Sequence, residues 1–188
     1  NHIGGTPYAG STRLLPIASG YGTNIYNGSV IAIVGAGTVE IVTDVGNNAD
    51  QFPVGVIGVF VGCTYTDPNL GTVVFRNNWP TGTVADDAQA YIIDDPDVVF
   101  MAQADGAVTQ ADLGQNTNFA AVQSTTTGDT TNGNSNSAVS STTATTATIA
   151  FRIVDFVDSP TSTVGDAFTD LLIKFNAGIH SYDRGLGV

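Results

Sequence analysis

The side chains that most often carry out chemistry in proteins are few and scattered in this chain. Its two histidines, His2 and His180, lie at opposite ends of the sequence, and Cys63 is the single cysteine. A zinc site needs three or four nitrogen, sulfur or carboxylate ligands, so the sequence predicts no metal centre. We expect both histidines at the surface or in an interface. Cys63 is expected to be a buried thiol, because free cysteine behaves as a small apolar side chain.

Aspartates gather in short clusters at Asp86-Asp87, Asp94-Asp95-Pro96-Asp97 and Asp158-Ser159-Pro160. Paired carboxylates could serve a glycosidase, and the same oxygens could bind calcium. However, aspartate beside proline or serine is typical of turns, where the carboxylate accepts hydrogen bonds from nearby backbone N–H groups. We therefore interpret the clusters as turns. The sequence also has no Gly-x-Ser-x-Gly elbow for a nucleophilic serine, so we predict a protein that is not an enzyme and has no cofactor.

Aromatic residues could form a platform on which sugar rings stack. Tyr65, Phe75, Trp79 and Tyr91 each lie in or beside a β-patterned run. That position favours core packing over sugar binding, because alternate side chains of a half-buried strand point into the core.

The composition indicates that strands, not helices, position these residues. The chain of 188 residues has one lysine, Lys174, and one glutamate, Glu40, whereas exposed helices draw heavily on both residue types. With 42% hydrophobic residues, the chain can build a real core. We predict an all-β fold: a β-barrel or sandwich body with an extended N-terminal arm and at most one or two short helices.

Short β-branched runs are separated by turn signals along the sequence, as in sandwiches and barrels. Gly35-Ala36-Gly37 predicts a hairpin, and Gly55, Gly58 and Gly62 predict a sharp bend or a close backbone approach. Thr109 to Gly114 predicts a short helical turn with a threonine cap. The predicted strands span residues 29–34, 38–43, 53–62, 72–76, 88–93, 98–104, 142–156 and 171–175.

Two segments lack this β pattern. Residues 1–28 read as an extended N-terminal arm with apolar anchors, and such an arm usually lies across a neighbouring surface. Residues 29–188 form one predicted domain, in which the Ser/Thr/Asn-rich stretch at about 124–137 is expected to be an exposed, mobile loop. The side chains that we expect at a subunit or partner interface are Tyr8, Leu14, Leu15, Ile17, Tyr21 and Tyr26.

The charge argues against two classes of partner. Seventeen acidic residues against five basic ones give a formal charge of −12, which repels phosphate backbones and anionic lipid headgroups. The basic residues are spread singly, whereas a DNA-binding face needs them clustered. The longest apolar run, residues 54–61, is too short to span a bilayer. We predict no nucleic-acid partner and no membrane association.

Residues 16–28 read Pro-Ile-Ala-Ser-Gly-Tyr-Gly-Thr-Asn-Ile-Tyr-Asn-Gly, and later stretches continue the same pattern in order. From about Pro7 to Tyr182, the chain resembles a family of tailed-bacteriophage head decoration, or cement, proteins. The Ser/Thr/Asn-rich loop and the tail from Asp183 to Val188 depart from the family pattern. The other matching stretches are residues 58–65, 78–83, 94–100, 165–170 and 176–182.

This resemblance implies a structural virion protein on the outer surface of the capsid. Cement proteins commonly form homotrimers that bind the major capsid protein and clamp adjacent capsomers against the pressure of packaged DNA. The expected function is therefore capsid decoration. A surface carbohydrate-binding or adhesin-like β module, suggested by the aromatic residues and acidic loops, remains the alternative.

Overall fold

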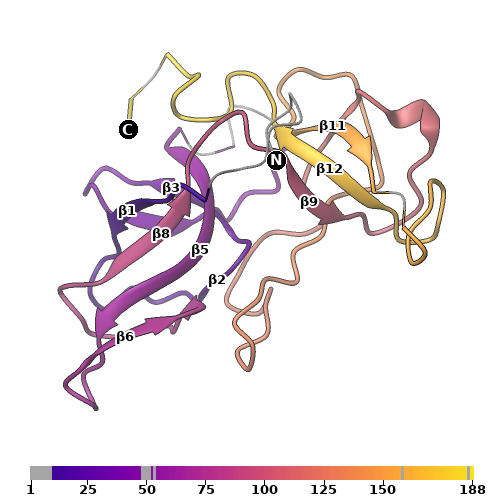
Figure 1. The fold of residues 1–188 in the computed structure, drawn as a ribbon. Helices are drawn as coiled ribbons and strands as arrows, with labels where there is room; N and C mark the ends of the chain where they lie inside the picture. Colours follow the sequence, from indigo (N-terminus) through magenta and orange to yellow (C-terminus); the bar gives the residue numbers. More distant parts are fainter. Residues whose placement is uncertain (1–9, 48–51, 53, 158, 186) are drawn as a thin grey trace.

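A computed structural model describes residues 10–47, 52, 54–157, 159–185 and 187–188. Its strands form three antiparallel sheets, and the helical part of the described chain is one 3-10 turn, η1, at Gln110–Asp112. The predicted all-β class is confirmed. Figure 1 shows the two larger sheets side by side, the first built from the N-terminal half of the chain and the second mainly from the C-terminal part.

The largest sheet has six strands in the order β1-β8-β5-β3-β4, with β6 also paired to β5. The second sheet has the order β10-β11-β12-β9, and β2 and β7 form a short ribbon. The strands are β1 Arg13–Pro16, β2 Ile25–Tyr26, β3 Val30–Ile33, β4 Val39–Ile41, β5 Val56–Thr66, β6 Val73–Arg76, β7 Asn78–Trp79, β8 Gln89–Ile93, β9 Phe100–Gln103, β10 Asn116–Thr117, β11 Phe151–Phe156 and β12 Asp170–Phe175.

Strand β5 is the longest strand and organises the six-stranded sheet. Its first half pairs with β3 and its second half with β6, while β8 runs along the other edge. The pairing register shifts beside Gly58 and Gly62, where φ is +149° and +138°. A Cβ on Gly58 would lie 2.0 Å from the carbonyl oxygen of Ile93. The predicted close backbone approach is therefore confirmed, and the strand bends where the glycines allow it.

The six-stranded sheet is buried on parts of both faces. One core cluster lies between it and the second sheet and includes Val59, Phe151 and Phe175. The other cluster lies on the opposite face and includes Phe60, Ile92 and Trp79. The first half of β5 reads Val-Ile-Gly-Val-Phe because consecutive side chains enter different clusters, as in strands that are covered on both sides.

The Ser/Thr/Asn-rich segment is hydrogen-bonded to the body, which the sequence did not predict. Figure 1 shows it running below the second sheet and beside β2. The backbone of Asn27 bonds to Gly133 at 2.9 Å and to Ser135 at 2.8 Å, and Asn77 donates to both Asn132 and Asn134. At its start, the side chain of Gln123 is fully buried. Backbone and amide hydrogen bonds replace the apolar contacts that its composition lacks.

Two local predictions agree with the structure, and two strand boundaries differ: the strand predicted at 53–62 spans Val56–Thr66. The 35–37 hairpin joins β3 to β4, with Val34 N–H donating to Thr38 at 2.9 Å. Thr109 caps η1, and Asp112 accepts from its backbone N–H and its hydroxyl. In contrast, the strand predicted from residue 142 begins only at Phe151. The alternating Thr/Ala residues before it have β propensity but offer few apolar side chains to bury.

Candidate binding surface

A row of exposed apolar side chains crosses one face of the six-stranded sheet. Leu14 of β1 lies opposite Tyr91 of β8, whose ring meets that of Phe75 of β6 edge to face at 5.7 Å. Val73 lies two residues from Phe75 on the same strand. The exposed fractions of Leu14, Phe75 and Val73 are 49%, 61% and 69%. We call these four residues the apolar strip.

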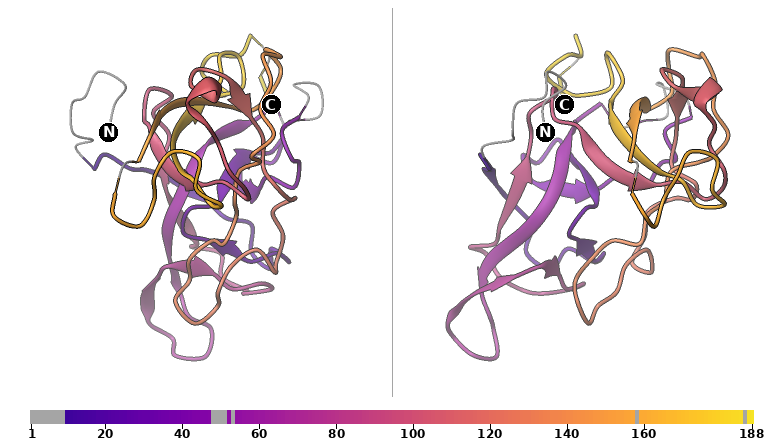
Figure 2. Two further views of the ribbon diagram at one scale, coloured as in Figure 1. Left: turned by 90° about the vertical axis from the view of Figure 1, so that its right-hand side faces the viewer. Right: turned by 45° about the vertical axis from the view of Figure 1, so that its right-hand side comes forward.

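The strip exists because the second sheet covers only part of this face. Along β3 and the first half of β5, the side chains of Val30, Val56 and Val59 point into the core between the sheets. The same face continues along β8, β1 and β6, beyond the edge of the second sheet. Figure 2 shows the β5–β6 hairpin projecting away from the second sheet. Apolar side chains on this continuation therefore remain in solvent.

Gly62 shapes the middle of the strip. It lies opposite Tyr91 in the pairing register, and a Cβ on it would lie 2.6 Å from the Cζ atom of Phe75. The aromatic ring therefore lies directly over the backbone of β5. A larger residue would push the Phe75 ring away from Tyr91 and break the continuity of the strip.

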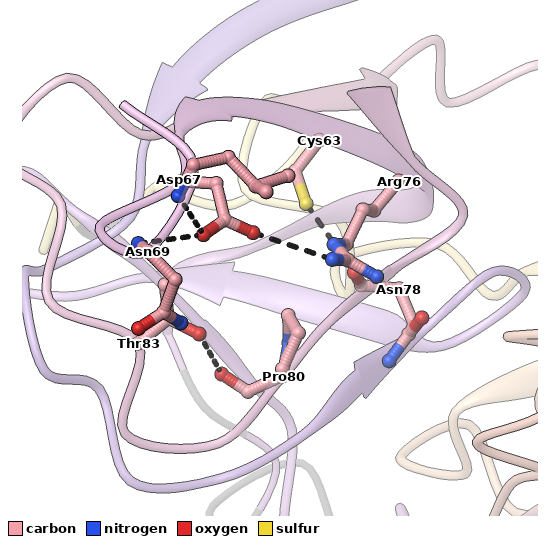
Figure 3. A network of polar contacts seen from close by, with 8 residues as sticks. Cys63, Asp67, Asn69, Arg76, Asn78, Pro80 and Thr83 are labelled. Carbon is pink, nitrogen blue, oxygen red and sulfur yellow. Dashed lines mark hydrogen bonds and ion pairs between the residues drawn. The ribbon is translucent and has the colours of Figure 1, made fainter. Parts of the chain in front are cut away.

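A polar network braces the projecting hairpin on its other side (Figure 3). The carboxylate of Asp67 accepts hydrogen bonds from the N–H groups of Asn69 and Leu70 and pairs with Arg76 at 3.3 Å. These contacts, the Asn69 N–H first among them, lower the pKa of Asp67. The network lines a shallow cleft of about 530 Å³ beside residues 80–84. Both carboxylate oxygens accept hydrogen bonds within the fold, so the network stabilises the turn.

A second cleft, of about 390 Å³, lies between the two sheets. Phe119, Phe151 and Phe175 contribute to its apolar wall, and the backbone segment 135–139 closes one side. Its volume lies within the range of about 300–1,000 Å³ that is usual for ligand sites. It contains no titratable side chain among its described lining residues.

The six residues predicted for an interface are distributed differently from the prediction. Ile17 and Tyr26 are buried in this chain, so they are core residues here. Leu15 and Tyr21 pack partly against the cluster around Trp79, and the Tyr21 hydroxyl accepts from Ile41 N–H at 3.2 Å. Leu14 is exposed and joins the strip. Tyr8 lies outside the described residues.

The predicted boundary at residue 28 also falls within the fold. Arg13–Pro16 is an edge strand of the six-stranded sheet, paired to β8. Ile25–Tyr26 pairs with Asn78–Trp79. From Arg13 onward, the segment predicted as an arm is part of the sheet structure, because its apolar residues find partners within the same chain.

His180 is buried, and the prediction of a surface or interface histidine is wrong for it. Its Nδ1 accepts the Tyr182 N–H at 3.2 Å, so Nε2 carries the proton that is donated to Ile57 at 2.8 Å. Burial lowers the pKa of the imidazole, opposed first by the Ile57 hydrogen bond. The neutral ring fixes the C-terminal segment to β5. His2 lies outside the described residues.

Cys63 is buried, as predicted, and burial raises the pKa of its thiol to about 12. The aromatic residues divide into two groups. Tyr65 and Trp79 are core residues, with ring centroids 5.3 Å apart. Phe75, also predicted to fill the core, is exposed because its side of β6 has no covering layer.

The contact of Asp95 is the turn contact that the sequence predicted, whereas the contacts of Asp87 and Asp94 join segments that are distant in the sequence. Asp95 accepts the Asp97 N–H at 2.9 Å, while Asp87 accepts the N–H and hydroxyl of Thr66. Asp94 accepts the Tyr182 hydroxyl at 2.6 Å and pairs with Arg13 at 3.5 Å. Asp158 lies outside the described residues. These carboxylates connect neighbouring turns and strands.

Within the described part of the chain, no group of three or more His, Cys, Asp or Glu side chains is arranged to hold a metal ion. The described residues also form no helix long and apolar enough to cross a bilayer. Comparison of the chain with protein-family models, with curated proteins and with solved structures gave no match.

Sequence reasoning missed Val73 and Phe75 as surface residues. The alternation Val73, Phe75 against Val74, Arg76 gave no indication of which side faces solvent, since both sets contain apolar residues. A weak signal was available in β5, where Cys63 and Tyr65 alternate with Thr64 and Thr66. Polar residues mark the open face of a strand, and Thr64 pairs with Phe75.

Proposed function

We propose that this chain is a structural, non-enzymatic protein that decorates the outer surface of a tailed-bacteriophage head and strengthens the contacts between capsomers. The observation that carries the proposal is the apolar strip, in which three large side chains are about half exposed or more on one face of the six-stranded sheet. A contiguous exposed apolar patch on an otherwise polar protein is typical of a protein–protein contact site.

The charge supports an external location on the particle. A formal charge of −12 disfavours binding to the packaged genome. The strip itself contains no charged residue, so it can be buried against a partner without removing charges from water. The major capsid protein is the proposed partner, and its contact surface for the strip would be apolar.

Repetition makes a modest contact effective. The resemblance to cement proteins supports assembly as a homotrimer, in which three strips act together. Linked binding sites raise the overall affinity far above that of one site. One strip per subunit, repeated over the shell, would then reinforce many capsomer boundaries.

The carbohydrate-binding alternative loses its main support. Of the four aromatic side chains considered for a stacking platform, those of Trp79 and Tyr65 are buried. Phe75 remains as an exposed ring, but its edge-to-face contact with Tyr91 gives no flat pair of rings on which a sugar could stack.

The test is binding to undecorated heads. Replacing Phe75 and Val73 by serine removes two of the most exposed side chains of the strip. Because a few central apolar residues supply most of the binding energy of an interface, we expect the affinity per subunit to fall about tenfold or more. Occupancy is measured by co-sedimentation with heads and by imaging of the particles.

The matched control is Phe168→Ser, which removes a phenylalanine of similar exposure, 59%, from a loop outside the strip. Wild-type occupancy of the double variant, or equal losses in the double variant and the control, would refute the assignment. A separate variant, in which residues 1–9 are deleted, tests the N-terminal segment without removing β1. Sedimentation of the free protein measures whether it is a trimer.

A further inference from the structure

The cleft between the sheets contains an open strand edge. Strand β9 is the last strand of the second sheet, and among the strands that the structure describes it pairs with β12 alone. Beyond its end, Ala104 N–H bonds to Thr169 at 2.9 Å, on the β12 side. On the opposite side, the Gln103 carbonyl accepts Val139 N–H at 2.9 Å. Residues of an antiparallel edge strand alternate between these two sides.

The backbone N–H and C=O groups of Met101 must therefore point to the same side as those of Gln103, away from β12. Segment 135–139 pairs with the chain only at the C-terminal end of β9, next to Gln103. Among the described residues, no backbone hydrogen bond outside the sheet ladder involves Met101. Its side chain is 70% exposed. The N–H and C=O groups of Met101 are thus open at the mouth of the apolar cleft, which includes Met101 in its lining.

The groove is electrically neutral in a strongly charged protein. The chain carries 17 acidic and five basic residues, yet none of the described residues that line the cleft is charged. Apolar walls formed by Phe119, Phe151 and Phe175 lie below a rim that includes Ser135 and Ser137. A charged ligand would lose its hydration here without a charged partner to compensate for it, and an uncharged ligand would not incur this cost.

We propose that the groove between β9 and residues 135–139 binds an extended, uncharged peptide segment of the partner protein. The segment adds to the edge of β9 by pairing with Met101 and places one apolar side chain in the cleft. Strand addition obtains affinity from main-chain hydrogen bonds and specificity from pockets for alternate side chains. A small apolar molecule could fill the cleft but would leave the open edge unpaired. That the peptide comes from the capsid partner rests on the proposed function.

The experiment uses the full chain and the synthetic probe acetyl-Gly-Thr-Val-Thr-Leu-Thr-Gly-amide, with titration calorimetry as the readout. Two versions of the probe are N-methylated on one or the other set of alternate amides. Because only one set can face β9, one version should bind about tenfold more weakly and the other nearly as well as the parent probe, given the usual contribution of one hydrogen bond. Replacing the leucine by aspartate should abolish binding.

On the protein side, Met101→Pro removes the open N–H, and proline is tolerated on an edge strand where this group faces outward. The control Met101→Thr keeps the N–H and removes the apolar side chain from the rim. Binding should be lost in the proline variant and retained in the threonine variant, with thermal unfolding showing that both are folded. The N-methylated probes test the same pairing in the unaltered protein.

Failure of the probe to bind, or equal binding of both N-methylated versions, would overturn the proposal. Self-association that the probe disrupts would assign the groove to a second copy and would also overturn it. The proposed function is tested separately, because Phe75→Ser lies outside the groove. If that variant no longer bound heads but still bound the probe, the result would show that the apolar strip and the groove are separate binding sites.

Discussion

Gln123 is expected to be one of the most important polar residues for stability. Its side chain is fully buried. The amide oxygen accepts Val30 N–H at 3.0 Å, and the amide nitrogen donates to the carbonyls of Val30 at 3.1 Å and Val42 at 2.9 Å. It thus fixes the start of the Ser/Thr/Asn-rich segment to β3 and to the residue after β4.

Replacing Gln123 by methionine keeps the approximate volume but removes all three hydrogen bonds. A buried polar group left without a partner costs about 1–3 kcal/mol. With the Val30 N–H and the Val42 carbonyl both affected, the free energy of unfolding should fall by about 2–5 kcal/mol. For a chain of this size, the midpoint of thermal unfolding should drop by about 4–20 °C. Gln123→Ala should have an even lower free energy of unfolding, because it also leaves a cavity.

Urea unfolding followed by circular dichroism measures the effect. Gln110→Ala, at an exposed position of η1, is the control and should change the free energy of unfolding by less than about 0.5 kcal/mol. If Gln123→Met were as stable as the wild type, the segment would not depend on these hydrogen bonds. The reasoning that amide contacts replace an apolar core there would then be wrong.

Three other predictions concern buried groups. Burial lowers the pKa of His180, so the unfolded chain binds a proton at a higher pH than the folded chain does. The free energy of unfolding should therefore fall as the pH drops from about 6.5 towards the pKa of the folded state. Thermal midpoints at pH 7 and pH 5 measure this effect, and His180→Gln should remove the difference between them. Gly58→Ala should lower the free energy of unfolding by about 2 kcal/mol or more, since its Cβ would overlap the Ile93 carbonyl, whereas Gly22→Ala, with open space around it, should be near neutral in the same urea assay. Cys63, with its thiol pKa raised to about 12, should react with a disulfide reagent at pH 8 only after unfolding.

Each of these outcomes has a contrary result. A pH dependence that persists in His180→Gln would assign the titration to another group. Equal stability of Gly58→Ala and Gly22→Ala would contradict the close backbone approach. Rapid labelling of native Cys63 would show that the thiol is accessible.

Local sequence signals were sufficient for most strands and turns. The β-branched runs and the glycines of β5 specify strands and bends because their preferences act over a few neighbouring residues. The Asp94-Asp95-Pro96-Asp97 cluster specified a turn for the same reason, since Asp95 accepts the nearby Asp97 N–H, whereas Asp87 bonds to the distant Thr66. The deficit of lysine and glutamate was enough to exclude a largely helical body.

The candidate surfaces could not be obtained in this way. Phe75 and Tyr65 both look like core residues in a β-patterned run, yet one is exposed and the other is buried. The difference depends on how far the second sheet extends over the first, which involves residues distant in the sequence. The same holds for His180, which is buried because the C-terminal segment returns to β5.

The sequence by itself determined the β class, the positions of most strands, the bends of β5 and the turn at Asp95, because each follows from short-range preferences. Only the tertiary structure decided which face of each strand is covered. It placed Ile17 and Tyr26 in the core, left Val73 and Phe75 in solvent, and opened the edge of β9 at Met101. Whether a face of a strand is covered depends on how the whole sheets pack together. The local sequence pattern does not indicate where one sheet stops covering the other.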